Sequence, residues 1–166
     1  HHKGAEQARH EAIKLSSTNW YFQLDSDDKI PSDAISEILK KISENPEAEF
    51  IYGPTMHFSK TSSFLMPPSK NPEVLSTSAL FSSQMPIKIS MYFRIGGYAN
   101  ELKYFAADWD FWLSVYEKNI VGAETEKILY HRRNHGNNVI ARNMSKWPEV
   151  INIVIGRHPK FFSNNK

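Results

Sequence analysis

The hydrophobic and polar positions of the chain follow two periods, one typical of helices and one typical of strands. Apolar residues that recur three and four positions apart predict helices over residues 5–15, 32–43, 108–118 and 146–155. Short apolar or alternating runs predict strands over residues 20–24, 49–53, 86–94 and 127–131. Because helices alternate with strands, the pattern favours an α/β sheet layered by helices.

Two segments interrupt this alternation. Residues 54–76 are rich in Pro, Ser, Thr and Lys and contain Pro67-Pro68, so we expect a loop or irregular excursion there. Segments of this kind often cover binding sites. Gly96-Gly97 follows the predicted strand over 86–94 and indicates a turn.

The first predicted strand leads directly into a cluster of carboxylates. The run Gln23-Leu24-Asp25-Ser26-Asp27-Asp28 places three carboxylates within four residues. Gathered negative charge is unfavourable unless a cation neutralises it, and Mg²⁺ and Mn²⁺ prefer oxygen ligands while keeping water and phosphate oxygens in their shell. The cluster therefore suggests a metal site that holds a nucleotide diphosphate. A solvated acidic turn before a helix is the alternative interpretation.

An EF-hand calcium loop beginning at Asp25 is excluded. It would place Lys29 at the fifth ligand position, Ile30 where the turn needs glycine, and Ser36 where a bidentate glutamate belongs.

A second candidate cluster opens the helix predicted over 108–118. Asp108 there is followed by Trp109 and Trp112, and a carboxylate at a helix start is often only an N-cap or a first-turn acid. If Asp108 faces a pocket lined by these rings, partial desolvation raises its proton affinity and makes it a candidate general base. Asp110 is then the structural carboxylate of the pair.

The third cluster ends the strand predicted over 127–131. The segment Tyr130-His131-Arg132-Arg133-Asn134-His135 brings two histidines and two arginines together before a Gly-Asn loop. An imidazole is a common metal ligand and a guanidinium binds phosphate, so the segment fits the same nucleotide-diphosphate site.

Composition narrows the classes of function. The 166 residues are 40% hydrophobic and 13% aromatic, which predicts a single globular domain with a real core. The net charge is only +2 and the basic residues are dispersed, so the sequence gives no case for nucleic-acid binding. Absence of cysteine excludes disulfides and cysteine-based zinc sites. Neither a transmembrane run nor a signal peptide is visible.

Five motifs follow one another along the chain. They are Gly4-x-x-x-Ala8-Arg9, Gln23-Leu24-Asp25-Ser26-Asp27-Asp28 with Pro31 behind it, Ile95-Gly96-Gly97-Tyr98, Asp108-Trp109-Asp110-x-Trp112-Leu113 and Arg133-x-His135-Gly136. In this order they resemble the motifs of family 2 inverting glycosyltransferases with the GT-A fold. The closest likeness is to bacterial capsule and polysaccharide transferases, including chondroitin-polymerase-like domains, and it spans roughly residues 4 to 140.

The resemblance implies the carboxyl-terminal portion of a GT-A three-layer α/β sandwich. Such domains normally begin with a βαβ unit that binds the nucleobase, and this chain starts after that unit. Residues 1–166 are therefore expected to form a partial glycosyltransferase domain, with residues 141–166 as a C-terminal helical extension.

The implied activity is transfer of a sugar from a nucleoside diphosphate donor, by default a uridine diphosphate sugar, to an acceptor hydroxyl with inversion. Mn²⁺ or Mg²⁺ is the implied cofactor, and the acceptor is a saccharide or lipid-linked. Asp108 matches the family's catalytic base. Asp27 and His135 match metal ligands. The residues that match donor contacts are Arg9, Asp25, Asp28 and Arg133.

Two positions depart from the family pattern. His10 stands where the family usually has asparagine, and Ala107 stands where an acidic residue commonly precedes the base. Two other readings therefore stay open: a catalytically inactive sugar-nucleotide-binding fragment and a metal-dependent phosphohydrolase. The expected location is the cytoplasm, with peripheral association with the inner face of the membrane left open.

Overall fold

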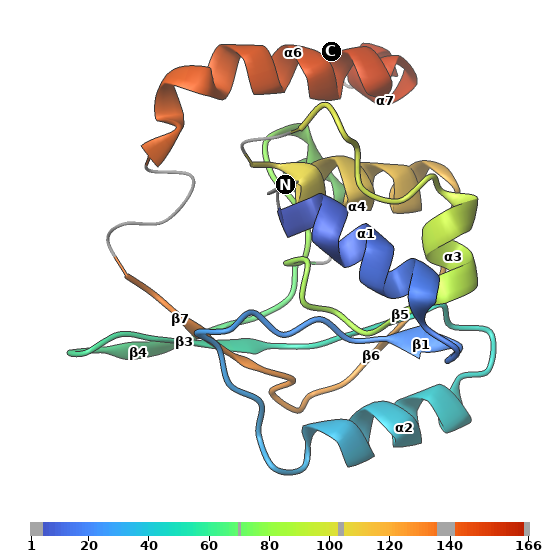
Figure 1. The fold of residues 1–166 in the computed structure, drawn as a ribbon, viewed down its shortest axis with the longest axis vertical. Helices are drawn as coiled ribbons and strands as arrows, with labels where there is room; N and C mark the ends of the chain where they lie inside the picture. Colours follow the sequence, from blue (N-terminus) through green and yellow to red (C-terminus); the bar gives the residue numbers. More distant parts are fainter. Residues whose placement is uncertain (1–4, 70, 103–104, 136–141, 165–166) are drawn as a thin grey trace.

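The structure is a computed structural model that describes residues 5–69, 71–102, 105–135 and 142–164 (Figure 1). The α-helices are α1 (Ala5–Leu15), α2 (Ala34–Glu44), α3 (Ile89–Arg94), α4 (Ala107–Glu117), α6 (Trp147–Arg157) and α7 (Pro159–Asn164). The 3₁₀ helices are η1 (Pro72–Ser76) and η2 (Met144–Lys146). The strands are β1 (Trp20–Tyr21), β2 (Phe50–Tyr52), β3 (Thr55–Phe58), β4 (Ser63–Met66), β5 (Ile87–Lys88), β6 (Gly122–Glu124) and β7 (His131–Arg133).

The main sheet has the strand order β1-β5-β2-β6 and helices on both faces. Strand β5 is antiparallel to β1 and to β2, and β2 is parallel to β6. Helix α2 covers one face, while α1, α3 and α4 lie over the other, with α6 and α7 beyond α4 (Figure 1). This layering confirms the α/β class that the alternating pattern predicted.

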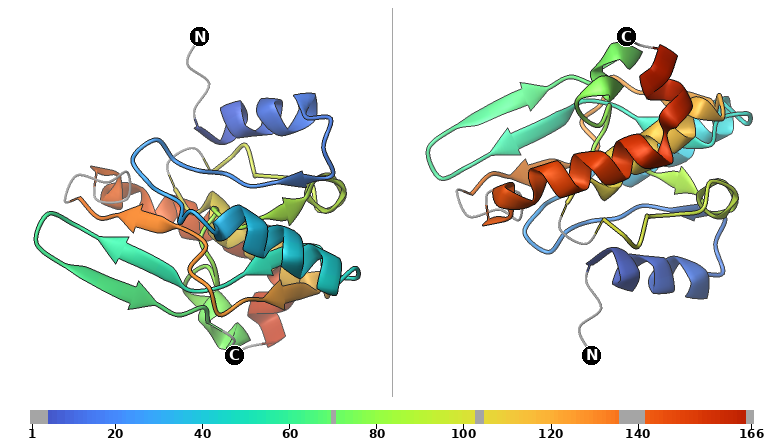
Figure 2. Two further views of the ribbon diagram at one scale, coloured as in Figure 1. Left: turned by 90° about the horizontal axis from the view of Figure 1, so that it is seen from below. Right: turned by 90° about the horizontal axis from the view of Figure 1, so that it is seen from above.

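A second sheet has the order β4-β3-β7. Strand β3 pairs in parallel with β7, aligning His57 with Arg132, and pairs antiparallel with β4, aligning Thr55 with Met66. The β3–β4 hairpin extends away from the rest of the molecule (Figure 2). The expectation of a loop over 54–76 is therefore wrong for most of that segment. The prediction failed because every side chain of β4 is exposed, so its sequence has no alternation of apolar and polar residues.

The strand predicted over 86–94 is also wrong for most of its length. Only Ile87–Lys88 form a strand, and the chain then continues as α3. Met91 and Tyr92 are adjacent and both fully buried, as residues of a short helix packed in the core can be. The apolar alternation from residue 87 to 93 was therefore no evidence for a strand. The turn predicted at Gly96-Gly97 is confirmed, because both residues have positive φ, 95° and 68°.

The strand predictions over 20–24 and 49–53 hold with shorter bounds, and β1 ends at Tyr21. The strand predicted over 127–131 is wrong for most of its length, because β7 begins only at His131. Strand β6 was not expected. It is a three-residue strand whose Gly122 lies against the ring of Phe50 in the parallel pair with β2.

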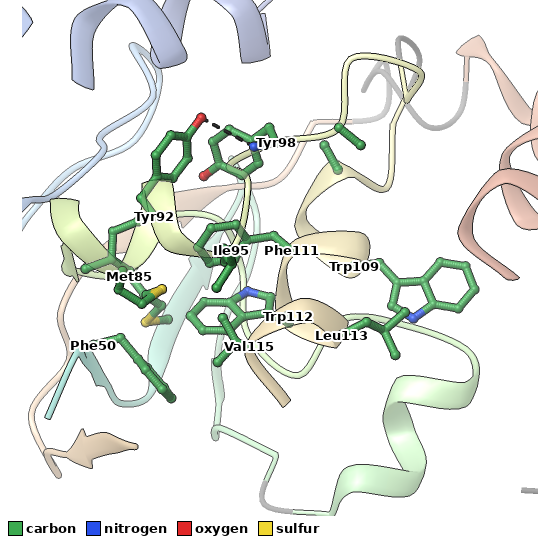
Figure 3. Close-up of a cluster of buried hydrophobic side chains, with 14 of the residues drawn as sticks. Phe50, Met85, Tyr92, Ile95, Tyr98, Trp109, Phe111, Trp112, Leu113 and Val115 are labelled. Carbon is green, nitrogen blue, oxygen red and sulfur yellow. Dashed lines mark hydrogen bonds between the residues drawn. The ribbon is translucent and has the colours of Figure 1, made fainter. Parts of the chain in front are cut away.

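An aromatic core fixes α4 to the main sheet (Figure 3). Trp112 is 2% exposed, and its ring lies 5.1 Å from that of Phe50 and 5.0 Å from that of Phe81. Close by, the Tyr98 N–H donates to the Tyr92 hydroxyl at 3.3 Å (Figure 3). Because large rings fill the space between helix and sheet, the N-terminus of α4 has a fixed position.

Within the part of the chain that the structure describes, no helix has the length and apolar character needed to cross a bilayer.

Candidate active site

The three carboxylates after β1 form a turn that is tied to strand β7. The Asp28 N–H donates to the Asp25 carbonyl at 3.0 Å, which closes the turn. The next residue, Lys29, exchanges two backbone hydrogen bonds with His131, at 3.0 and 2.7 Å. The acidic turn and the first residue of β7 therefore hold each other in place.

Two of the three carboxylates are braced by hydrogen-bond donors. The Gln84 side-chain amide, in a residue only 3% exposed, donates to Asp25 Oδ2 at 2.9 Å and to Asp28 Oδ2 at 2.8 Å. Arg9 Nη2 donates to Asp25 Oδ1 at 2.8 Å, and the Arg133 N–H donates to Asp28 Oδ1 at 2.8 Å. These donors offset the repulsion between neighbouring negative charges.

The pKa of Asp28 lies above its ordinary value. Burial is the largest cause, the hydrogen bond from the Arg133 N–H opposes it, and the charges of Asp27 and Asp25 add to the rise.

Asp27 and His135 lie side by side at the surface of the turn. His135 Nε2 is 3.1 Å from Asp27 Oδ2, and the two side chains are 49% and 44% exposed. The structure thus brings together the two predicted metal ligands, which are 108 residues apart in the sequence.

This pair fits a hard divalent ion only as part of its shell. No cluster of three or more His, Cys, Asp or Glu side chains that could hold a metal occurs among the described residues. Mg²⁺ and Mn²⁺ in nucleotide sites usually take one or two protein ligands and complete the shell with water and phosphate oxygens. Asp27 and His135, open to solvent and in contact with each other, are the donors that such an ion would find here.

Arg133 also contacts the acidic turn. Its Nε donates to the Asp27 carbonyl at 3.0 Å, and its guanidinium lies 4.6 Å from the centre of the Phe58 ring. These contacts hold the side chain beside Asp27, and its contact with phosphate stays a prediction.

Asp108 occupies the first turn of α4, as the sequence predicted. Its Oδ1 accepts a hydrogen bond from the Trp109 N–H at 2.9 Å. Burial raises the pKa of Asp108, while this hydrogen bond and the positive charge of Arg132 act in the opposite direction. A half-buried carboxylate with raised proton affinity has the property that a general base needs.

A cavity of about 460 Å³ opens in front of Asp108. Trp109 and Trp147 form part of its wall, and Pro67-Pro68 at the end of the β3–β4 hairpin forms another part. Residues of the 54–76 segment thus border this cavity, and that they cover a binding site stays a prediction. Among the described carboxylates, Asp108 alone lines this cavity, and the acidic turn does not.

Several residues of the site had no signal in the sequence. Gln84 is an isolated glutamine before Met85-Pro86, and no motif in the neighbouring sequence indicates that it bridges two carboxylates. Trp147 was assigned only to a C-terminal helix. Arg132 could have been found, because side chains alternate along a strand and the residue next to Arg133 faces the opposite side of the sheet.

Comparisons with known proteins agree with this architecture. The structure is similar to the crystal structure of S. aureus TarS 1–349, with a TM-score of 0.66 and 16% identity over 93% of this chain and 44% of that one. The TarS 1–349 complex with UDP-GlcNAc gives a TM-score of 0.64 and 14% identity over 93% of this chain and 47% of the other. These similarities confirm the GT-A-like α/β fold.

The sequence is similar to an uncharacterised glycosyltransferase of Haemophilus influenzae. The identity is 27% over 124 residues, which are 70% of this chain and 42% of that protein. No protein-family model matches the chain. The chain thus spans less than half the length of the relatives just described. Gly4 and Gly136 of the sequence motifs lie outside the described residues.

Proposed function

We propose that the chain is part of a glycosyltransferase that moves a sugar from a nucleoside diphosphate donor to an acceptor hydroxyl with inversion. The observation that carries the proposal is the position of β7 and the residues after it. Arg133 and His135 contact the acidic turn at Asp27, while Arg132 lies at the cavity beside Asp108. One short segment thus joins the candidate diphosphate site to the candidate base.

The donor is proposed to be a uridine diphosphate sugar, and the acceptor a saccharide or a lipid-linked saccharide of a bacterial polysaccharide pathway. The TarS complexes with UDP-GlcNAc and with UDP support the choice of donor. Peripheral binding to a membrane and the reading of the chain as a partial domain stay predictions.

Different residues of the chain have different proposed roles in the transfer. Asp27 and His135 would hold Mn²⁺ or Mg²⁺, which when bound supplies positive charge to the leaving diphosphate. Arg9, Asp25 and Asp28 would orient the donor beside them.

Asp108 would take the proton of the acceptor hydroxyl. The acceptor oxygen then forms a bond to the anomeric carbon from the face opposite the diphosphate. The bond between that carbon and the phosphate oxygen breaks at the same time, and its electron pair leaves with the nucleoside diphosphate. Attack from the opposite face inverts the configuration.

The test measures Mn²⁺ binding and nucleoside diphosphate release in the protein that carries this chain. We expect Asp27→Ala and His135→Ala each to weaken Mn²⁺ binding by about tenfold or more. Asp33→Ala is the matched control, since Asp33 is an exposed aspartate whose partner is Lys127. With a panel of sugar nucleotides, the wild type should release nucleoside diphosphate in an acceptor-dependent way.

Three results would contradict the proposal. Unchanged Mn²⁺ binding in both variants would place the metal elsewhere. Release of inorganic phosphate without any dependence on acceptor would indicate a phosphohydrolase. Donor binding with no turnover by the wild type would indicate a binding fragment.

A further inference from the structure

The cavity beside Asp108 contains one permanently positive side chain. Of the described residues that line it, Arg132 is the only lysine or arginine. His57, its partner in the parallel ladder between β3 and β7, lines the same cavity. A guanidinium, an imidazole and the carboxylate of Asp108 therefore line the cavity together with several hydroxyl side chains.

Strand geometry separates the two neighbouring arginines. Successive side chains of a strand point to opposite faces, so Arg133 reaches the acidic turn and Phe58 while Arg132 reaches the cavity. Arg132 forms no ion pair within 4.0 Å with any carboxylate of the described residues, although its charge acts on Asp108 and Asp28. Arg132 is also exposed and lines the cavity, so its guanidinium is available to a ligand there.

Three aromatic residues, Phe105, Trp109 and Trp147, also line the cavity. Phe105 and Trp147 stack with ring centres 5.5 Å apart and 6° between their planes. Trp109 stacks on Trp147 at 6.2 Å and 8°. The three rings stack on one another and give the cavity apolar aromatic surface, which can contact the apolar part of a sugar, and the volume of about 460 Å³ lies in the range of small-ligand sites.

We propose that this cavity is the acceptor subsite and that the acceptor sugar carries an anionic group, a carboxylate or a phosphate, which pairs with Arg132. The inference rests on the proposed transferase function and adds the chemical class of the acceptor. The forked guanidinium of Arg132, which is exposed, matches the geometry of a carboxylate or a phosphate and can bind either through charge-assisted hydrogen bonds. The donor diphosphate is assigned elsewhere, since Asp25, Asp27, Asp28 and His135 do not line the cavity.

Such pairing would link acceptor binding to proton transfer. The charge of Arg132 lowers the proton affinity of Asp108. An anion bound to Arg132 cancels part of that effect, so Asp108 becomes a stronger base when the acceptor is in place. A neutral acceptor would bind without this gain.

The first test measures binding of three sugars to the 166-residue chain by titration calorimetry: glucuronate, glucose 6-phosphate and glucose. We expect at least one anionic sugar to bind about tenfold more tightly than glucose, and Arg132→Gln to remove that preference while leaving glucose affinity unchanged. Glucuronate against glucose 6-phosphate distinguishes carboxylate from phosphate. Arg94→Gln is the matched control, because Arg94 is an exposed arginine paired with Glu49.

Equal binding of all three sugars by the wild type would overturn the inference, and so would an equal loss of all three in Arg132→Gln. If that variant fails to fold, the wild type still decides. Its preference for the anion should shrink between about 0.05 M and about 0.5 M salt, as an ion pair requires.

The second test separates this inference from the proposed function. In transfer assays, Arg132→Gln should raise KM for an anionic acceptor about tenfold and leave KM for its neutral analogue and for the donor unchanged. A rise in donor KM instead would assign Arg132 to the diphosphate and overturn the inference. Absence of any nucleoside diphosphate release by the wild type would contradict the transferase, whereas the sugar-binding result would stand on its own.

Discussion

The aspartates of this chain differ in behaviour because their surroundings differ. Asp25 and Asp28 are held by a shared amide, Asp27 is half exposed beside a histidine, and Asp108 is half-buried at a helix start. Asp110, two residues further on, is fully buried and paired with Arg157 and His158. Residue type and spacing were enough to select these positions, whereas their partners became known only from the fold.

The proposed role of Asp108 as the base predicts that its raised pKa sets the acid limit of activity. Asp108 must be ionised to accept a proton, so transfer should fall as the pH drops through a pKa that burial keeps above the ordinary aspartate value. Arg132→Gln removes a charge that lowers this pKa, and should shift the acid limb to higher pH. Asp108→Asn should lower kcat by roughly 10²–10⁴. Profiles of kcat/KM against pH for the three proteins check this, and superimposable profiles would exclude Asp108 as the base.

Gln84 should control the affinity of the acidic turn for its ligand. Gln84→Leu removes the donor shared by Asp25 and Asp28, leaving the two carboxylates to repel each other. We expect Mn²⁺ and donor affinity to fall by about tenfold, as for residues that support metal ligands. Equilibrium dialysis with Mn²⁺ measures this. Gln7→Leu, at a surface glutamine bonded only to Glu11 among the described residues, should bind like the wild type.

At the scale of elements, the predictions succeeded where burial of one face gave the element a clear hydrophobic period. The predicted helix over 5–15 has the bounds of α1, and the one over 108–118 is α4 shifted by a single residue. Strand β4 left no mark because the residues from Ser63 to Met66 are exposed on both faces. Strands of two or three residues offer too few positions for a period to be recognised, so their ends were misplaced.

The residues of the candidate site were likewise predictable only where the sequence has a clear local pattern. Asp27 and His135 come from segments with dense charge, and a cluster of charge is visible in a sequence. Gln84 and Trp147 act through long-range contacts that only the tertiary structure creates.

The turn between α3 and α4 depends on Gly97. Its φ is 68°, and a Cβ added there would lie 2.7 Å from the Tyr92 ring. We expect Gly97→Ala to lower the free energy of unfolding by roughly 1–3 kcal/mol, through backbone strain and the clash. Gly156→Ala is the control, since Gly156 lies inside α6 and a Cβ there meets nothing within 4 Å. That variant should gain roughly 0.5–1 kcal/mol. Urea denaturation compares them, and equal midpoints would contradict the prediction.

At the scale of the whole molecule, a buried ionic cluster joins the C-terminal helices to the helix of the candidate base. Asp110 Oδ1 on α4 accepts from Arg157 Nε at 2.6 Å and lies 3.1 Å from His158 Nε2, at the junction of α6 and α7. His158 Nδ1 is 2.9 Å from Glu117 Oε2. Helix α6 also carries Trp147 into the cavity wall. The helix that contributes Trp147 to the cavity is therefore anchored on α4 itself.

His158 should make stability depend on pH. Burial lowers its pKa, but hydrogen bonds to Asp110 and Glu117 outweigh burial and raise the pKa above the ordinary histidine value. A raised folded-state pKa means that the stabilisation is fully present below the unfolded pKa and is lost as pH rises through the folded one.

We expect His158→Gln to lower the free energy of unfolding by roughly 3 kcal/mol near about pH 6, with a smaller difference near about pH 9. Thermal or urea denaturation at both values measures it. His10→Gln, at a partly buried histidine whose ring lies beside the Tyr92 hydroxyl, is the comparison variant. A difference that grows with pH would show that His158 is buried as the neutral ring.

Strand β4 has a consequence for how the protein behaves at high concentration. Phe64, Leu65 and Met66 are 47%, 52% and 44% exposed on an edge strand that pairs, among the described residues, only with β3. An apolar edge with unpaired backbone groups is a template for another strand. Aggregation on concentration or mild warming should therefore start at this hairpin, before the core unfolds. Light scattering of Leu65→Lys against the wild type would show it as a delayed onset, and this variant is the one that we would expect to stay dispersed.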